Sequence, residues 1–294
     1  MNKAEKISSI IRCPKCYGEL YLSMPDVNCV NPLCGAKYVF ENNCPVLMTP
    51  EDKAHLQMFL SKHSAQTVPA FNNKFRMRFL PPGPCYDPRR NERLKRFWST
   101  FSEEAIIIDI GSQSAKLRED VINFDLAPFQ NVNLVGNALR IPVVDNSVDG
   151  VINTGVLEHV EDVDQVIKEI HRILKPNGVF YIEIPFMQGY HPDPTDFQRL
   201  TYQGLERSLK NFKIEEMDVS SGPYSNICWA IRETIALTSN TDRGFTWLWI
   251  IAGWLTFWIK YFDRFVVGKR FAHRVASSYY VIATKQVKEE GVNS

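Results

Sequence analysis

The sequence predicts an α/β fold with a Rossmann-like parallel sheet, and three observations support it. Residues 105–110 (AIIIDI) form an almost unbroken apolar run, as a parallel strand buried on both faces requires. This run continues into 109–112 (DIGS), where a glycine lets the backbone approach a ligand. A second apolar strand ends at Asp125 and a third element ends at Asn137. Polar groups at successive strand ends are expected of a sheet that binds a nucleoside, because a carboxylate there can accept hydrogen bonds from a ribose diol.

A helix and further strands are predicted beyond this region. Asp162 and Gln165 predict a capping box, and the helix that it opens has apolar residues at helical spacing. The apolar segments 179–184 and 279–284 are predicted to be strands, the second of them the last strand of the sheet.

Residues 136–185 (GNALRIPVVDNSVDGVINTGVLEHVEDVDQVIKEIHRILKPNGVFYIEIP) resemble the central motifs of class I S-adenosylmethionine-dependent methyltransferases. The resemblance spans most of residues 105–221. It implies an enzyme with a seven-stranded sheet and with S-adenosyl-L-methionine lying across the carboxyl ends of the first strands. Carried over by position, the resemblance implies that Asp109, Gly111 and Ser112 line the methionine and ribose part of the cofactor and that Asp125 holds the ribose hydroxyls. It also implies that Asn137 and Ala138 contact the adenine and that Glu158 and His159 lie near the methionine.

Two positions depart from the family pattern. Gln113 stands where the family normally has a second glycine, so the loop is expected to take a different path. Asn137 stands where an aspartate commonly accepts from the adenine amino group, although an amide oxygen can also accept one such bond. A catalytically silent binding module is therefore an alternative to an active enzyme.

Four cysteines near the N-terminus have metal-ligand spacing. Cys13, Cys16, Cys29 and Cys34 can place four thiolates around one Zn²⁺, which we expect to be structural, with two disulfides as the alternative. Residues 10–49 also resemble the zinc ribbon of the small methyltransferase-activator family, whose members partner methyltransferases acting on tRNA and translation factors. The expected organisation is a zinc ribbon over 1–49, a helical linker over 50–100 and the methyltransferase domain over 101–290.

The predicted linker carries a helix near residues 51–64 and then a basic run beside aromatic residues: Arg89, Arg90, Arg93, Lys95 and Arg96. Such a run is more often a solvated helix face than a phosphate contact, and we expect the former. The formal net charge of +1 gives no field that would favour nucleic acid.

Acceptor chemistry is expected in the segment after residue 185. His191, flanked by Asp193 and Asp196, could take a proton from a hydroxyl as methyl moves from sulfur to oxygen, or could be purely structural. Arg199 could hold an anionic group of the acceptor. The three predicted catalytic residues are therefore His191, Asp196 and Arg199.

Residues 245–259 (FTWLWIIAGWLTFWI) lack any charge and hold four tryptophans, with basic residues on both sides. A spanning helix needs about twenty apolar residues, so we expect a hydrophobic helical insertion, about 238–275, that lies at a bilayer interface. Packing on the sheet or in a homodimer interface is the alternative reading.

Together these features predict a cytoplasmic methyltransferase, peripheral at the inner face of the membrane, that O-methylates a membrane-associated or lipid-linked glycan-type acceptor. An RNA or translation-factor methyltransferase is the main rival function.

Overall fold

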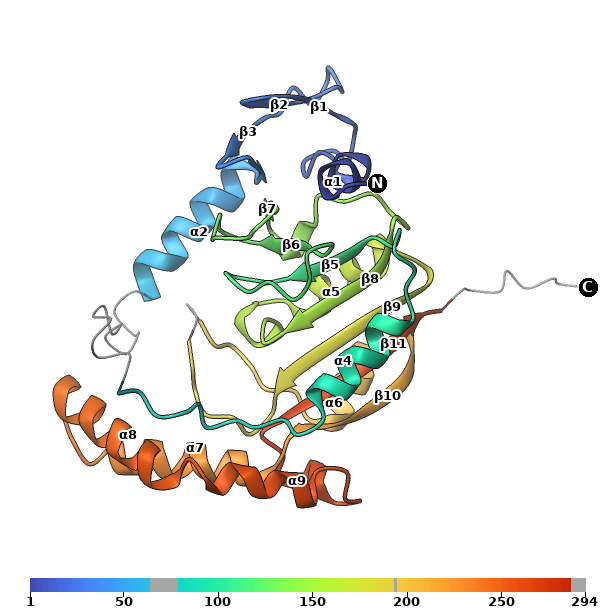
Figure 1. Ribbon diagram of the computed structural model, residues 1–294. Coiled ribbons are helices and arrows are strands. Elements are labelled where there is room, and N and C mark those ends of the chain that lie inside the picture. Colours follow the sequence, from blue (N-terminus) through green and yellow to red (C-terminus); the bar gives the residue numbers. More distant parts are fainter. Residues whose placement is uncertain (64–78, 193–194, 287–294) are drawn as a thin grey trace, which may run out of the picture.

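A single mixed sheet runs through the molecule in the computed structural model, which describes residues 1–63, 79–192 and 195–286 (Figure 1). Its strand order is β1-β2-β3-β4-β7-β6-β5-β8-β9-β11-β10. The predicted Rossmann-like fold is confirmed in the middle and at one end of this sheet. The strands of that part are β5 (Ile107–Ile110), β6 (Ile122–Asp125), β7 (Leu134–Gly136), β8 (Val148–Thr154), β9 (Leu174–Pro185), β10 (Phe212–Ser221) and β11 (Ser278–Lys285).

Five of these strands are parallel. β5 pairs with β6 on one side and with β8 on the other, β6 continues to β7, and β8 continues to β9. The chain thus changes direction across the sheet between β5 and β8, and open α/β sheets bind ligands at the carboxyl ends of strands at such a point. β11 is antiparallel to both β9 and β10.

The N-terminal strands extend the same sheet. They are β1 (Leu20–Ser23), β2 (Asp26–Cys29), β3 (Lys37–Glu41) and β4 (Cys44–Leu47), and helix α1 (Lys3–Ile10) precedes them. β4 runs parallel to β7, with Val46 opposite Val135 and Leu47 opposite Gly136. Helix α2 (Pro50–His63) follows β4 directly, so this pairing brings the start of α2 to the carboxyl end of β7. The predicted domain boundaries stay a prediction.

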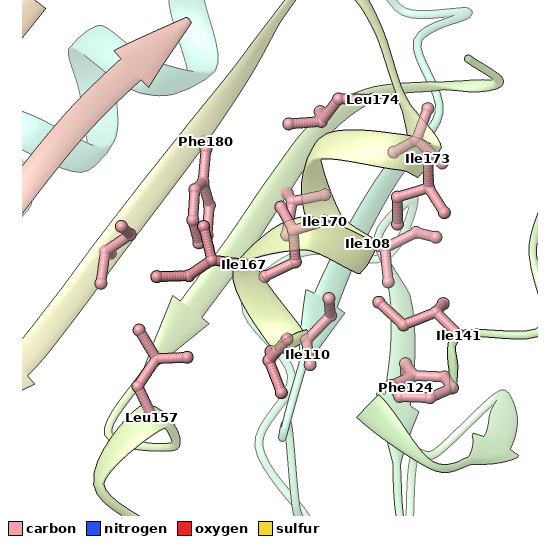
Figure 2. Packing of buried hydrophobic residues seen from close by; sticks show 14 of the residues in the cluster. Ile108, Ile110, Phe124, Ile141, Leu157, Ile167, Ile170, Ile173, Leu174 and Phe180 are labelled. Carbon is pink, nitrogen blue, oxygen red and sulfur yellow. The ribbon is translucent and has the colours of Figure 1, made fainter. Parts of the chain in front are cut away.

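Helix α5 (Val163–Ile173) covers one face of the parallel strands. Figure 2 shows Ile167 and Ile170 of this helix in the same buried cluster as Ile108 and Ile110 of β5. Asp162 caps the helix by accepting from the Gln165 amide, as predicted. The Gln165 side chain instead donates to the Leu139 carbonyl, so the reciprocal half of the expected capping box is replaced by a contact with a neighbouring loop.

Several helices separate β10 from β11 and lie at the opposite end of the molecule from the N-terminal strands (Figure 1). They are α7 (Pro223–Ala236), α8 (Asp242–Thr256), the short turns η3 (Ile259–Phe262) and η4 (Ala272–Val275), and α9 (Asp263–Val266), while α6 (Tyr202–Ser208) precedes β10. The buried Asp263 carboxylate accepts from the amides of Gly222, Tyr224 and Ser225 and so ties α9 to the start of α7. Among the described residues no helix is both long and apolar enough to cross a membrane.

The basic run at helix α4 (Arg90–Ser99) is only in part the solvated face that the sequence indicated, because Arg89, Lys95 and Arg96 are exposed whereas Arg93 is buried. Arg93 is only 1% exposed, pairs with Asp87 and Glu183, and lies 3.9 Å from the centroid of the Tyr280 ring. Arg90 also pairs with Glu183, and Arg96 pairs with Glu216 at 2.8 Å. These cations therefore join α4 to β9, β10 and β11, and the run gives no support to a nucleic-acid surface.

Replacing Arg93 with alanine is expected to lower the free energy of unfolding by about 3–5 kcal/mol, because it leaves the largely buried Asp87 carboxylate without its arginine partner. Arg96→Ala removes an exposed pair of the same helix and should cost less than about 1 kcal/mol. Urea denaturation of both variants measures the difference, and equal losses would contradict this assignment.

Candidate cofactor and acceptor site

A cavity of about 450 Å³ lies at the carboxyl ends of β5, β6, β7 and β8. The loops that follow these strands form its wall, together with two residues of α2. Its lining includes Gly111 and Gln113 after β5, Asp125 and Leu126 at the end of β6, Asn137 and Ala138 after β7, His159 after β8, and Asp52 and Leu56 of α2. Five of the predicted cofactor-binding residues, Gly111, Asp125, Asn137, Ala138 and His159, therefore face one cavity.

Gly111 is required by both conformation and space. Its φ of +79° lies in the region that favours glycine, and an added Cβ would lie 2.2 Å from a Val156 methyl carbon. Gln113 also adopts a positive φ, +47°, and its amide donates to an Asp125 carboxylate oxygen at 2.8 Å. The loop thus takes a glycine-like turn at Gln113 despite the missing glycine.

Backbone amides hold the Asp125 carboxylate in place. Besides Gln113, the amides of Leu126 and Ala127 donate to it at 2.7 and 3.3 Å. A carboxylate with several amide donors has a defined orientation, as a group that receives ribose hydroxyls requires.

Asp52 was missed by sequence reasoning. It accepts from the Asn137 side-chain amide at 2.9 Å, while the Asn137 amide oxygen accepts from the Leu139 backbone at 2.9 Å. The other Asp52 oxygen accepts from the Thr49 hydroxyl at 2.8 Å, at the start of α2. At the position of Asn137, where the methyltransferase family commonly has an aspartate, the cavity wall therefore does contain a carboxylate, which α2 supplies. The T-x-x-D spacing could have indicated the helix start, but not its position at the cavity.

The other three predicted cofactor residues do not line the cavity. Asp109 is buried, and this burial raises the pKa of its carboxyl group to about 7. The positive charge of Arg90 acts to lower that pKa, and the nearby Asp125 carboxylate acts to raise it. Ser112 is buried as well, and its hydroxyl has no hydrogen-bond partner among the described residues. Glu158 is buried too, and its carboxylate lies next to His159.

The structure brings Glu158, His159 and His191 together. The His159 and His191 Nε2 atoms lie 3.7 and 3.6 Å from Glu158 Oε1. Burial lowers the pKa of His191, but the hydrogen bonds to Glu158 and to the Gly189 carbonyl, with the charge of Asp196, outweigh it and raise that pKa overall. His159 lines the cavity, so this cluster adjoins it.

Asp196 and Arg199 hold the loop that carries His191. Asp196 accepts from the His191 amide at 2.9 Å and pairs with Arg199 at 2.6 Å. Arg199 also donates to the carbonyls of Gln188 and Gly189. The Arg199 guanidinium thus bonds within the loop itself. This geometry suits a residue that positions His191 better than one that binds an anionic group of the acceptor. Asp193 lies outside the described residues.

Helix α7 packs against the same loop. A Cβ added at Gly189 would lie 1.9 Å from Trp229 Nε1, and the rings of His191 and Trp229 are 5.6 Å apart. The hydrophobic helices and the predicted acceptor loop are therefore in direct contact.

The four predicted metal-binding cysteines also converge. The Sγ distances are 3.8 Å between Cys13 and Cys34 and 3.5 Å between Cys16 and Cys29, and all four Sγ atoms lie within 4.8 Å of one another. Disulfide sulfurs are about 2.05 Å apart, whereas thiolates at about 2.3 Å around a tetrahedral Zn²⁺ are about 3.8 Å apart. The Gly18 amide, which donates to Cys16 Sγ, lowers the pKa of that thiol to about 7. The donor set therefore fits zinc better than two disulfides.

Comparison with known proteins identifies the central segment. Residues 94–182 match the family described as a methyltransferase domain. A Mycolicibacterium smegmatis protein named as a probable S-adenosylmethionine-dependent methyltransferase is 44% identical over 57 residues, 19% of this chain and 22% of that protein. A Geobacillus stearothermophilus demethylmenaquinone methyltransferase is 38% identical over 80 residues, 27% of this chain and 30% of that protein.

A solved structure of similar fold is phosphoethanolamine N-methyltransferase 2 from Haemonchus contortus, in complex with S-adenosyl-L-methionine. It has a TM-score of 0.43 and 15% identity, and the match covers 67% of this chain and 53% of that chain. The predicted enzyme class, an S-adenosylmethionine-dependent methyltransferase, is confirmed at the level of the matched domain. Because the chain spans less than a third of each of these two curated relatives, the activity of the whole chain is inferred below.

Asp52→Ala is expected to weaken S-adenosylmethionine binding about tenfold or more, as loss of one hydrogen bond to a charged group does. Thr49→Ala removes the hydroxyl that donates to Asp52 but keeps the carboxylate, which the Thr49 backbone amide and the Asn137 side chain still hold in place. Its cofactor affinity should therefore stay within about threefold of wild type. Calorimetric titration measures both. Equal losses of cofactor affinity in the two variants would mean that cofactor binding depends on the conformation of the start of α2 and not on the Asp52 carboxylate.

Proposed function

We propose that this chain transfers methyl from S-adenosylmethionine to a hydroxyl of a membrane-associated, lipid-linked glycan-type acceptor. The observation that carries the methyltransferase part is the convergence of Gly111, Asp125 and the Asn137–Asp52 pair on one cavity within a matched methyltransferase domain. The acceptor part rests on the helices between β10 and β11.

In our proposal the cofactor lies in the cavity in one orientation. Asp125 would receive the ribose hydroxyls, and the Asn137–Asp52 corner would receive the adenine, with the apolar Leu126 and Leu139 beside the ring. The methionine end would then lie toward Gly111 and His159. The bound cofactor supplies an activated methyl group on a sulfonium sulfur.

The residues beside His159 would act on the acceptor. As the C–S bond breaks and a C–O bond forms, the acceptor hydroxyl loses its proton, and the cofactor leaves as a thioether. His191 can take that proton at Nε2, because its Nδ1 lies 2.7 Å from the Gly189 carbonyl and is held there. Asp196 and Arg199 would position His191 by fixing its loop.

An exposed apolar face supports an acceptor held at a membrane. Five large side chains of the α8 segment share one side of the helix and are about half exposed: Trp247, Ile251, Trp254, Leu255 and Trp258. Exposed basic residues precede and follow this segment in the sequence, namely Arg243, Arg264, Lys269, Arg270 and Arg274. An apolar tryptophan-rich face with basic flanking residues suits the interface of an anionic bilayer. Trp229 of α7, which packs on α8, links this face to His191.

A specific observation favours a second candidate, C-methylation of a quinone ring. The matched Geobacillus stearothermophilus relative is named as a demethylmenaquinone methyltransferase. The two candidates share a lipid-soluble acceptor and differ in the atom that receives the methyl group. Incubation with labelled cofactor and bacterial membrane extract, followed by mass spectrometry of the labelled lipid, separates them. Absence of any labelled product despite cofactor binding would favour the silent module.

We also propose that the four cysteines bind one structural Zn²⁺. The N-terminal strands of the ribbon are short, and a module of this size gains much of its folding free energy from metal. The metal would thereby hold β4 against β7 and α2 at the cavity.

Removal of zinc by a chelator is expected to weaken cofactor binding as well as unfold the ribbon, because Asp52 reaches the cavity only through β4 and α2. Calorimetry before and after chelation, with zinc restored as the control, measures this. Full cofactor affinity in a protein shown by elemental analysis to be free of zinc would contradict the proposal.

The double substitution Ile251→Glu with Leu255→Glu is expected to reduce binding to anionic vesicles at least tenfold, because it places two charges on the apolar face. Tyr21→Glu changes a similarly exposed apolar residue of β1 and should leave vesicle binding unchanged. Flotation with phosphatidylglycerol vesicles, without detergent, measures both. Wild-type protein that stays unbound and sediments as a dimer would overturn the membrane assignment in favour of a second copy of this chain.

A further inference from the structure

Three potential metal ligands converge beside the cavity. One ligand atom each from Glu158, His159 and His191 lies within 4.8 Å of the other two. In a tetrahedral site with metal–ligand bonds of about 2.1 Å, ligand atoms are about 3.4 Å apart. The observed distances of 3.6 and 3.7 Å from Glu158 Oε1 to the two imidazoles are close to this value.

The second ring nitrogen of each histidine is already engaged. His159 Nδ1 contacts the Thr195 carbonyl, and His191 Nδ1 lies 2.7 Å from the Gly189 carbonyl. A carbonyl only accepts, so each Nδ1 donates to it. Each Nε2 faces Glu158, and when a cation binds, that nitrogen gives up any proton and offers its lone pair to the metal. Metal-binding histidines usually show this arrangement, in which a backbone carbonyl fixes the tautomer and the ring orientation.

Glu158 gives an independent sign of a missing ligand. Its side chain is 1% exposed, and its Oε2 atom has no hydrogen-bond partner among the described residues. An unpaired buried carboxylate oxygen is costly, since the group loses its hydration without compensation. The Trp229 ring of α7 lies 5.6 Å from the His191 ring, on one side of the cluster.

We propose that Glu158, His159 and His191 bind one divalent first-row cation at the acceptor end of the cofactor cavity. Two histidines and one carboxylate leave coordination positions open, as in catalytic metal sites. This inference rests on the proposed function and changes how the proton leaves. With the cation bound, His191 Nε2 is a ligand and no longer takes the proton; the acceptor hydroxyl, made more acidic by coordination, gives its proton to water, and the cation orients its oxygen. This site shares no residue with the four-cysteine cluster, which lies among the N-terminal strands.

Manganese is the probe that distinguishes the two sites, because thiolates prefer zinc whereas Mn²⁺ accepts carboxylate and imidazole ligands. The full chain, loaded with one equivalent of zinc, is titrated with Mn²⁺ while electron paramagnetic resonance follows the free ion. The site predicts one bound Mn²⁺ per chain. Glu158→Gln and His191→Asn should each weaken that binding at least tenfold, and His273→Asn, a histidine outside the cluster, should not.

Circular dichroism of each variant shows whether it folds, and His159→Asn provides a third ligand variant should either of the others fail. No saturable Mn²⁺ binding by the wild-type chain, or equal binding by all variants, would overturn the site. Calorimetric titration with S-adenosylmethionine, without manganese, is run on the same wild-type sample. Cofactor binding without manganese binding rejects only the metal site, whereas loss of cofactor binding rejects the proposed function itself.

Discussion

Parallel pairing among β4, β7, β6, β5 and β8 is the constraint on which the cavity depends. Because parallel strands end at the same edge of a sheet, the loops after β5, β6 and β7 meet there, and so does α2 after β4. Gly111, Asp125 and Asn137 come from three such strand ends, and Asp52 comes from a fourth. The N-terminal strands therefore help to form the cavity, because β4 delivers α2 and the Asp52 carboxylate to it.

Buried polar contacts connect the helices near β9, β10 and β11 with the segment that carries His191. Arg93 connects α4 to Glu183 near the end of β9, and the segment after β9 carries His191. Asp263 fixes the start of α7, whose Trp229 packs on that segment. The apolar helix α8 packs on α7, and α7 in turn contacts the segment that carries His191.

Features that depend on neighbouring residues in the sequence were predictable from local patterns. The buried strands, the glycine turn at Gly111 and the acidic strand end at Asp125 were all visible, because each follows from the hydrophobic run that precedes it. The cysteine cluster was visible from spacing alone. Gln113 adopts the positive φ of the glycine that it replaces, which residue type alone would not suggest.

Contacts between distant segments were not predictable in this way. Asp52 and Asn137 are 85 positions apart and meet only because β4 pairs with β7. The basic run looked like a solvated face, yet Arg93 is buried against carboxylates and a tyrosine from three other segments. Likewise Glu158 and His191 belong to loops after different strands, and no spacing rule indicates that they meet.

The most direct test of the account is calorimetric titration of the zinc-loaded chain with S-adenosylmethionine, beside Asp125→Ala. We expect micromolar binding at one site per chain and its loss in the variant, because we propose that the Asp125 carboxylate receives the ribose hydroxyls. Absence of binding in the wild-type chain, or equal binding in the variant, would contradict the placement of the cofactor at this edge of the sheet.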